Sequence, residues 1–548
     1  MKDKKIENFL QHIKCHQQKI IFGLFITLLL YSLIGCFPVS LYEADGIGVA
    51  NGIMVMQQQG LGENPFAYRV AEHPGTHILL YLVNIVLHQD VYDVFSILSA
   101  FAMVLFVISS TFFISKLTGK SFGVIGIVLL LIQETTASGY YANSTVIACC
   151  IVVIGMWILL DAQSVIKAVI AGLLIGFGIS CRLEVSLILI PVIFWIILKE
   201  KKITRTLFVA GMSAVLALMG VFAIMHITYS DVINLFRVHQ TFRNSNLAIE
   251  GIPILGMRNI RSYVSFISVS FLLLTISGIF VLFRQKKYGM IFFCIFGIIP
   301  FLVIFGSSVV SPKYLYASIP YFAILILYGL ELIRFEKPYR FFSIFVGVLF
   351  VGQYFFGLQV SLASKPYREQ IQPVLVKVLS IPQITHSITE ADIVIGSGAS
   401  LSTDDAYRLT SGLIYAPIFW QTQKAERKAA VDGVSDFIHS QEYQDESIVC
   451  VDYDACQIMR NLMLKDGYTL KILAADQVEM TIKDQAPAIL YFTDGLQSRE
   501  AVLTYLNPIG RSNVLLVTTY PSLQYDLQHS TNAITGVSDL GYLINTNN

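Results

Sequence analysis

Long apolar runs recur along most of this 548-residue sequence and constrain its fold more than any other feature. A helix needs roughly 20 apolar residues to cross the hydrocarbon core of a bilayer. Runs of that length, or nearly so, occupy residues 20–37, 94–114, 122–133, 145–160, 165–179, 185–198, 207–225, 264–283, 289–305, 316–333 and 341–357. The sequence therefore predicts a polytopic α-helical membrane protein with about eleven crossings.

Composition agrees with this class. Hydrophobic residues make up 55% of the chain and charged residues only 14%, and the mean hydropathy is +0.65. These values do not describe a soluble globular protein. The formal net charge of +1 provides no overall field that would attract nucleic acid, so we expect no nucleic-acid partner.

The short apolar segment 76–87 decides the predicted orientation of the chain. About a dozen residues are typical of an interfacial or re-entrant helix rather than a crossing. If this segment does not cross, the positive-inside rule is satisfied by basic residues at Lys116, Lys120, Lys167, 199–205, 284–287 and 334–340. The loop 41–93, Arg182, the loop 228–263, Lys313 and everything after Leu362 are then predicted outside.

The N-terminus is expected to lie inside. Four lysines, Lys2, Lys4, Lys5 and Lys14, precede the first apolar run, and no small-residue cleavage site follows it. We therefore expect this run to remain as a membrane anchor.

After the last apolar run the composition changes to short β-rich runs that alternate with helical patterns. Strands are predicted at 392–395, 447–451, 470–473, 488–492 and 514–518, with helices at 403–410 and 455–464. The pattern favours an extracytoplasmic α/β domain with a mostly parallel sheet at residues 363–548, after a membrane domain at residues 1–362.

Two acidic residues, Glu43 and Asp45, follow the first apolar run directly. Carboxylates at a membrane surface lose hydration that only partners can replace, so a chemical task such as that of a catalytic base is a plausible reason for them. The alternative is structural: Asp45 caps the following helix, and Glu43 is solvated.

Arg182 lies between two apolar segments, 176–181 and 183–190. A guanidinium in this position must either reach the membrane surface or meet an anion. Phosphate is one such anion, because the guanidinium fork donates two hydrogen bonds together. Glu184 is expected to orient Arg182, and a purely structural Arg182–Glu184 contact is the alternative.

The cysteines indicate neither a metal site nor a definite disulfide. Five of them lie in or beside apolar runs, where a thiol behaves as a small hydrophobic group: Cys36, Cys149, Cys150, Cys181 and Cys294. A Cys450–Cys456 disulfide stays open, and no His and Cys spacing predicts zinc. No metal or cofactor is expected.

The order of these features resembles the GT-C superfamily of membrane glycosyltransferases. A short start, one span, an external loop with an acidic motif, the sequence Glu72-His73-Pro74, many further spans and an external domain carry the resemblance. More narrowly, it resembles the group of protein O-mannosyltransferases and lipid A aminoarabinose transferases. These enzymes take a sugar from a polyprenyl phosphate and pass it to an acceptor outside the membrane.

The resemblance implies a catalytic site in the loop 41–93. Asp45, or Glu43 in its place, would be the base, at the start of an amphipathic helix 46–59. Pro74 would begin the next helix and direct its N-terminus towards the lipid phosphate. Donor phosphate binding is expected at Glu72, His73, Arg182 and Lys313, and substrate binding at Tyr68, Arg69, Arg243 and Glu184.

Two of these expectations have structural alternatives. Glu72 and His73 would otherwise form a surface turn with an exposed histidine. Tyr140 and Tyr141 lie in the loop where the family often has Arg and Asp; they could stack on a sugar ring, but we expect them in the aromatic belt at the membrane interface.

The predicted function is therefore an inverting, polyprenyl-phosphate-dependent glycosyltransferase of the cell membrane. Its partners would be the lipid-linked sugar, the bilayer, and an envelope glycan, lipid or protein as acceptor. The alternatives are a transporter or flippase of envelope precursors, in which Glu43, Asp45 and Arg182 line a translocation path, and a non-catalytic scaffold that binds glycolipid.

Overall fold

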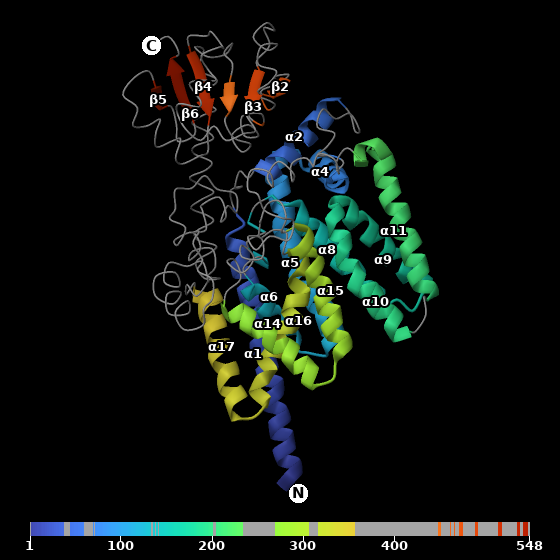
Figure 1. Ribbon diagram of the computed structural model, residues 1–548, viewed down its shortest axis with the longest axis vertical. Helices are drawn as coiled ribbons and strands as arrows, with labels where there is room; N and C mark the ends of the chain where they lie inside the picture. The colour runs from blue at the N-terminus through green and yellow to red at the C-terminus, as the bar shows by residue number, and fades with distance from the viewer. Residues whose placement is uncertain are drawn as a thin grey trace.

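The computed structural model describes most of the N-terminal two thirds of the chain and short parts of the remainder. The described residues are 2–37, 44–59, 70, 72–132, 135–136, 139–140, 142–200, 204–233, 269–305, 316–356, 448–450, 461, 465, 471–474, 488–491, 513–517, 534–536 and 541–545. The described part before residue 357 is helical, and a sheet lies near the C-terminus (Figure 1).

Every apolar run predicted from the sequence is helical over most of the residues that the structure describes. The α-helices are α1 (Lys2–Ile34), α2 (Ala44–Gln59), α4 (Pro74–Leu87), α5 (Val91–Thr118), α6 (Phe122–Leu131), α8 (Ser144–Leu160), α9 (Val165–Cys181), α10 (Leu189–Glu200), α11 (Arg205–Ile224), α14 (Val269–Arg284), α15 (Tyr288–Phe305), α16 (Ile319–Gly329) and α17 (Lys337–Phe356). The 3-10 helices η1 (Leu183–Ile188) and η3 (Leu330–Arg334) precede α10 and follow α16, respectively, and residues 316–318 form a further 3-10 turn before α16.

Side-chain caps fix where several of these helices begin. The Asp90 carboxylate accepts hydrogen bonds from the backbone of Tyr92 and Asp93 at the start of α5. Asn143 and Ser164 cap α8 and α9 in the same way. Because each cap satisfies backbone N–H groups that have no partner within the helix, these polar residues set the turns between apolar helices.

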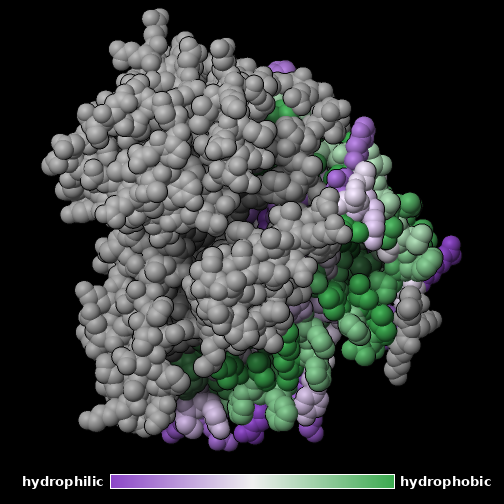
Figure 2. Space-filling model, turned by 45° about the horizontal axis from the view of Figure 1, so that its top comes forward, coloured by the Kyte–Doolittle hydropathy of each residue, from purple (hydrophilic) through white to green (hydrophobic). Residues whose placement is uncertain are grey.

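The bundle presents apolar side chains to its surroundings. Four described helical segments are long and apolar enough to cross a membrane: Gln17–Ile34, Val91–Thr118, Arg205–Ile224 and Tyr316–Arg334. Large hydrophobic side chains such as Val86, Phe208 and Phe341 are mostly exposed. Figure 2 shows hydrophobic side chains over much of the described part of one face, with hydrophilic residues at its edge. This is the surface of an integral membrane protein.

Small residues let α9 and α11 pack at backbone contact. Gly172 and Gly176, one turn apart on α9, face Ala210 and Ala214 on α11. A Cβ atom at Gly176 would lie 2.8 Å from the Cα atom of Ala214. Close approach of this kind is the usual way in which helices associate in lipid, and here it fixes the helix that ends just before Arg182.

The C-terminal sheet is mixed. Its strands are β1 (Ile448–Cys450), β2 (Lys471–Ala474), β3 (Ala488–Tyr491), β4 (Asn513–Val517), β5 (Ile534–Gly536) and β6 (Gly541–Asn545), in the order β2-β3-β1-β4-β6-β5. Strands β2, β3, β1 and β4 pair in parallel, as predicted, with β1 and β3 in register at Val449 and Leu490.

The other edge of the sheet was not predicted. β6 pairs antiparallel with both β4 and β5. The predicted strand 392–395 and helix 403–410 lie outside the described residues, as does most of the predicted helix 455–464, of which Asn461 is helical.

Candidate functional site

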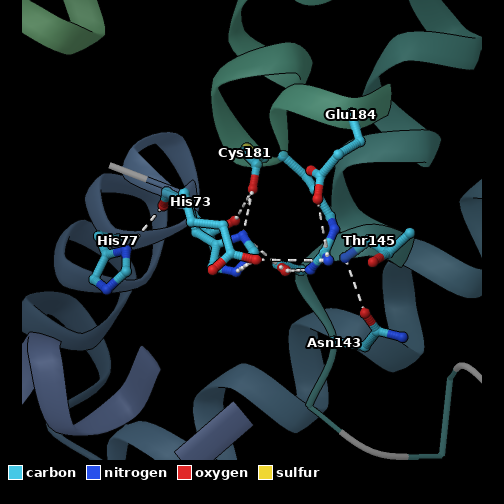
Figure 3. Close-up of polar contacts among 10 residues, drawn as sticks. His73, His77, Asn143, Thr145, Cys181 and Glu184 are labelled. Atoms are coloured by element: carbon cyan, nitrogen blue, oxygen red, sulfur yellow. Dashed lines mark hydrogen bonds and ion pairs between the residues drawn. The ribbon is translucent and has the colours of Figure 1, made fainter. Parts of the chain in front are cut away.

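Four polar side chains form a closed ring where α4 and α8 begin and α9 ends. They are Glu72, His73, Ser144 and Arg182, and all four are buried. Glu72 and His73 immediately precede α4, Ser144 is the first residue of α8, and Arg182 follows α9. Figure 3 shows these chain ends converging around His73, Cys181 and Glu184. We call these four residues the polar ring.

Arg182 makes three of the contacts in this region. Its Nη1 donates to Ser144 Oγ at 3.3 Å, and its Nη2 lies 3.7 Å from Glu72 Oε1. The same Nη2 lies 3.5 Å from Glu184 Oε1, in η1. A buried guanidinium needs such partners, because an unpaired buried charge is strongly unfavourable. This contact between Arg182 and Glu184 is compatible with the expected orienting role and with the structural alternative.

His73 completes the ring. Its Nε2 lies 3.3 Å from Glu72 Oε1, and its Nδ1 lies 3.2 Å from Ser144 Oγ and 3.4 Å from the carbonyl oxygen of Cys181. The His73 side chain is 1% exposed, so the alternative of a surface turn with an exposed histidine is wrong.

Local packing explains why α4 begins at this point. Pro74 occupies the first turn, as predicted, where its missing N–H is no loss. A Cβ atom at Gly75 would meet the side chain of Ser180 and lie 2.8 Å from the backbone nitrogen of Cys181. Thr76 Oγ1 donates to the Cys181 carbonyl at 3.1 Å. The start of α4 is therefore held directly against the end of α9.

A second layer holds the ring residues in place. Asn143 Oδ1 accepts from the backbone N–H of Thr145 at 2.9 Å, and Ser99 Oγ accepts from the backbone N–H of Asn143 at 2.9 Å. His77 Nδ1 lies 2.8 Å from the carbonyl oxygen of His73, as Figure 3 also shows. These contacts fix Ser144 and the backbone of His73.

Helix α2 lies over this region and is buried almost all round. The helix expected at 46–59 is present, but residues 46–53, 55 and 56 are buried, so its expected amphipathic character is wrong. The reason is its small residues: a Cβ atom at Gly46 would lie 2.7 Å from the Ala142 carbonyl oxygen, and one at Gly52 would lie 3.0 Å from His77 Nε2. Glycines on both sides let α2 approach neighbours that a longer side chain would exclude.

The structure describes only some of the other predicted site residues. Asp45 is the second residue of α2, so it lies within the helix rather than at a cap before it, and its side chain lies outside the described part. Glu43, Tyr68, Arg69, Arg243 and Lys313 also lie outside the described residues. Tyr140 is fully buried in the hydrophobic core, so its predicted place in an interfacial belt is wrong.

Ser144 was missed from the sequence. The signal was present, since Asn143 directly precedes an apolar run and is a favoured helix cap. Its neighbour therefore starts a helix, but nothing in the sequence places that start beside residues 73 and 182. The five cysteines predicted to pack, Cys36, Cys149, Cys150, Cys181 and Cys294, are buried free thiols, as expected.

The polar ring is suited to binding an anion. A guanidinium, a hydroxyl group and an imidazole converge, and the N-termini of α4 and α8 add the positive ends of two helix dipoles. Glu72 now makes the contacts with Arg182 and His73 that an incoming oxyanion would make. Among the residues that the structure describes, no group of three or more His, Cys, Asp or Glu side chains is arranged to hold a metal ion.

Comparison with known proteins identifies the fold. No protein-family model and no curated sequence matches the chain. The crystal structure of ArnT from Cupriavidus metallidurans bound to undecaprenyl phosphate superposes with a TM-score of 0.53 at 13% identity, over 96% of this chain and 97% of ArnT. ArnT in the apo state gives a TM-score of 0.50 at 14% identity over the same shares.

A third, less similar structure is the archaeal oligosaccharyltransferase AglB from Archaeoglobus fulgidus, with an inhibitory peptide and a dolichol-phosphate. Its TM-score is 0.45 at 10% identity, over 92% of this chain and 70% of AglB. The similarity to ArnT extends over nearly the whole of both chains. The chain therefore shares the overall fold of ArnT, which agrees with the architecture on which the resemblance in its sequence was based.

Proposed function

We propose that this protein is an inverting glycosyltransferase that moves a sugar from a polyprenyl phosphate to an acceptor outside the cytoplasm. The observation that carries the proposal is the buried polar ring at the start of two helices, within a GT-C fold. The structural neighbour ArnT was crystallised with undecaprenyl phosphate, which supports the same class of donor here.

In this proposal the polar ring binds the donor phosphate. Arg182, His73 and Ser144 donate hydrogen bonds to its oxygens, while Glu184 holds the guanidinium in place and Glu72 yields its contacts to the phosphate. Charge on this phosphate grows as the bond to the sugar breaks, so donors fixed beforehand stabilise the transition state more than the bound donor. Lys313 is proposed as a further phosphate ligand, with Tyr68, Arg69 and Arg243 as substrate-binding residues.

Asp45 is proposed as the base. An acceptor hydroxyl attacks the anomeric carbon, its proton passes to the Asp45 carboxylate, and the carbon–oxygen bond to phosphate breaks with its electron pair on the phosphate. Attack opposite the leaving group inverts the anomeric centre. Glu43 is the alternative base. Support comes from α2, whose first turn contains Asp45 and whose Gly46 packs on Ala142, close in sequence to Ser144.

The site is proposed to face outwards. Eleven crossings with the N-terminus inside place the starts of α4 and α8 and the end of α9 on the outer side. Residues 1–362 would form the membrane domain and residues 363–548 the extracytoplasmic domain that contacts the acceptor, which is an envelope glycan, lipid or protein. The membrane is proposed to be the cell membrane.

Turnover of labelled polyprenyl-phosphate sugars tests this function. The purified protein, Asp45→Asn and Glu43→Gln would each be given a panel of donors with cell-envelope extract as acceptor. We expect transfer by the wild type, loss of at least about 100-fold in Asp45→Asn, and little change in Glu43→Gln. Loss in Glu43→Gln alone would move the base to Glu43. No transfer from any donor by folded wild-type protein would favour a transporter or a scaffold instead.

A further inference from the structure

Two residues of the C-terminal part contact the helical bundle beside α2. Asn461 Nδ2 donates to Asn51 Oδ1 at 2.8 Å and lies 3.6 Å from the Met54 sulfur. Lys465 Nζ lies 2.6 Å from Asp90 Oδ2. Asn461 and Lys465 are both helical and four residues apart, which is the spacing at which two helical side chains share a face.

The asparagine pair is buried, and so it is more than a surface contact. Asn51 is fully buried and Asn461 is 1% exposed. Removing either amide leaves a polar group of the other without this partner and away from water, which is unfavourable. The Lys465–Asp90 pair is partly exposed and lies beside it. The other Asp90 oxygen, Oδ1, caps the start of α5.

Helix α2 connects this contact to the polar ring. Asn51 lies in the middle of α2, and the next residue, Gly52, packs on His77, one turn after His73. At the start of α2, Gly46 packs on Ala142, just before Asn143 and Ser144. A single helix therefore touches the C-terminal part, α4 and the segment that leads into α8, and these close backbone contacts leave it little freedom to shift alone.

We propose that Asn461 and Lys465 are positioning residues that dock the C-terminal part on α2 and on the start of α5, and so hold α2 and Asp45 over the polar ring. The inference rests on the proposed function, because it concerns the placing of the base. The C-terminal part thereby acts on the step that transfers the sugar, in addition to any contact that it makes with the acceptor.

If these two residues position α2, their substitution should lower kcat and leave donor binding nearly unchanged. Asn461→Ala and Lys465→Met lower kcat, by about 10- to 100-fold for the buried asparagine and less for the lysine, because a small displacement of a reacting group is costly. The donor KM and the Kd for polyprenyl phosphate stay within about two-fold, since the ring residues are unchanged. Lys465→Arg restores most of the activity, and Gln57→Ala, at an exposed position of α2, serves as the control.

Double-mutant cycles test the contacts themselves. Asn51→Ala combined with Asn461→Ala, and Asp90→Asn combined with Lys465→Met, are expected to be no worse in kcat than the poorer single variant. Asp90→Asn keeps an oxygen for the cap of α5. Additive losses in both cycles, or an unchanged kcat in folded Asn461→Ala, would overturn the inference.

The same double-mutant cycles can be measured as midpoints of thermal unfolding of the full-length protein. The midpoints test the docking contacts without any sugar transfer, so failure of the docking inference can be told apart from failure of the proposed function. If wild type binds donor and transfers sugar but the cycles show no coupling, only the docking inference fails. If wild type transfers no sugar, the positioning role fails together with the proposed function, whether or not the unfolding midpoints are coupled.

Discussion

At the scale of single residues, the site depends on groups that are far apart in the sequence. Glu72 and His73 were predicted from a short motif, and Arg182 from its place between apolar segments. Their mutual contacts were not predictable, because three different helix ends bring them together. The sequence signals a helix start at Asn143 but gives no sign that Ser144 belongs to the site. Ser144 belongs to the ring only because it lies between His73 Nδ1 and Arg182 Nη1.

Ser144→Ala is expected to weaken polyprenyl-phosphate binding by about 5- to 20-fold, the effect of one lost hydrogen bond to a charged group together with a loosened ring. Isothermal titration in nanodiscs would measure the affinity. The neighbouring Thr145→Val is the matched control, because Thr145 Oγ1 is buried without a hydrogen-bond partner in the described structure. Equal effects of the two substitutions would remove Ser144 from the site.

At the scale of elements, the sequence predicted the helices well because apolar length and capping residues are local signals. The burial of α2, in contrast, could not be predicted from local signals in the sequence. Its alternating small and apolar residues look one-sided in sequence, whereas contacts with Ala142, His77 and Asn461 bury it on several sides. Strands β5 and β6 were missed, although β6 is as long as β4, because the antiparallel pairing of β6 with β4 and of β5 with β6 is not a local signal.

Gly172→Ala is expected to destabilise the bundle by about 1–3 kcal/mol, since the added methyl group would lie 2.7 Å from Ser213 Cβ and against the Ala210 backbone, which cannot rotate away. Thermal unfolding followed by tryptophan fluorescence would report the change. Gly211→Ala, on α11 and with open space around its Cα, should leave the midpoint unchanged or raised. A stable Gly172→Ala would show that α9 and α11 are less closely packed.

Two ion pairs at turns between helices, Lys116–Asp161 and Lys120–Glu331, differ in burial and should therefore differ in their contribution to stability. The hydrogen bond from Lys116 lowers the pKa of Asp161, but both side chains are about half exposed, so the pair contributes little. Lys120 is more deeply placed: it pairs with the partly buried Glu331 and lies 4.3 Å from the centre of the Tyr328 ring. Burial lowers the pKa of Lys120, and its hydrogen bond to Glu331 opposes that shift.

Lys120→Met should therefore destabilise the protein by about 1–2 kcal/mol, because it leaves Glu331 with only its weaker partners. Lys116→Met should change the unfolding midpoint little. Chemical denaturation of both variants in the same detergent would decide. A larger effect of Lys116→Met would contradict the burial difference seen here.

At the scale of the whole molecule, the polar ring, α2 and the Asn461 contact gather at one end of the bundle. The Lys120–Glu331 pair lies at a second set of turns, because Lys120 is between α5 and α6 and Glu331 is in η3. Figure 1 shows α2 and α4 at the end nearer the C-terminal sheet. The positive-inside rule, applied to sequence alone, assigns those two sets of turns to opposite sides of the membrane. Which of these two ends faces the cytoplasm stays a prediction from the sequence.

Two glutamines test this orientation directly. Gln89, before α5, is predicted outside and Gln163, between α8 and α9, inside, and both are exposed. With the eight native cysteines replaced by serine, a membrane-impermeant maleimide should label Gln89→Cys but not Gln163→Cys in intact cells, while both should react after permeabilisation. The reverse pattern would place the polar ring on the cytoplasmic side and contradict transfer to an outside acceptor.

The polar ring is proposed to bind the phosphate of a polyprenyl donor. The most direct test is equilibrium binding of undecaprenyl phosphate to purified wild-type protein and Arg182→Gln in nanodiscs, with Lys116→Gln as a control for the loss of one cation elsewhere. We predict binding by wild type and Lys116→Gln, and affinity reduced about 10- to 100-fold in Arg182→Gln. Equal affinity of wild type and a folded Arg182→Gln would show that the polar ring does not bind the donor phosphate.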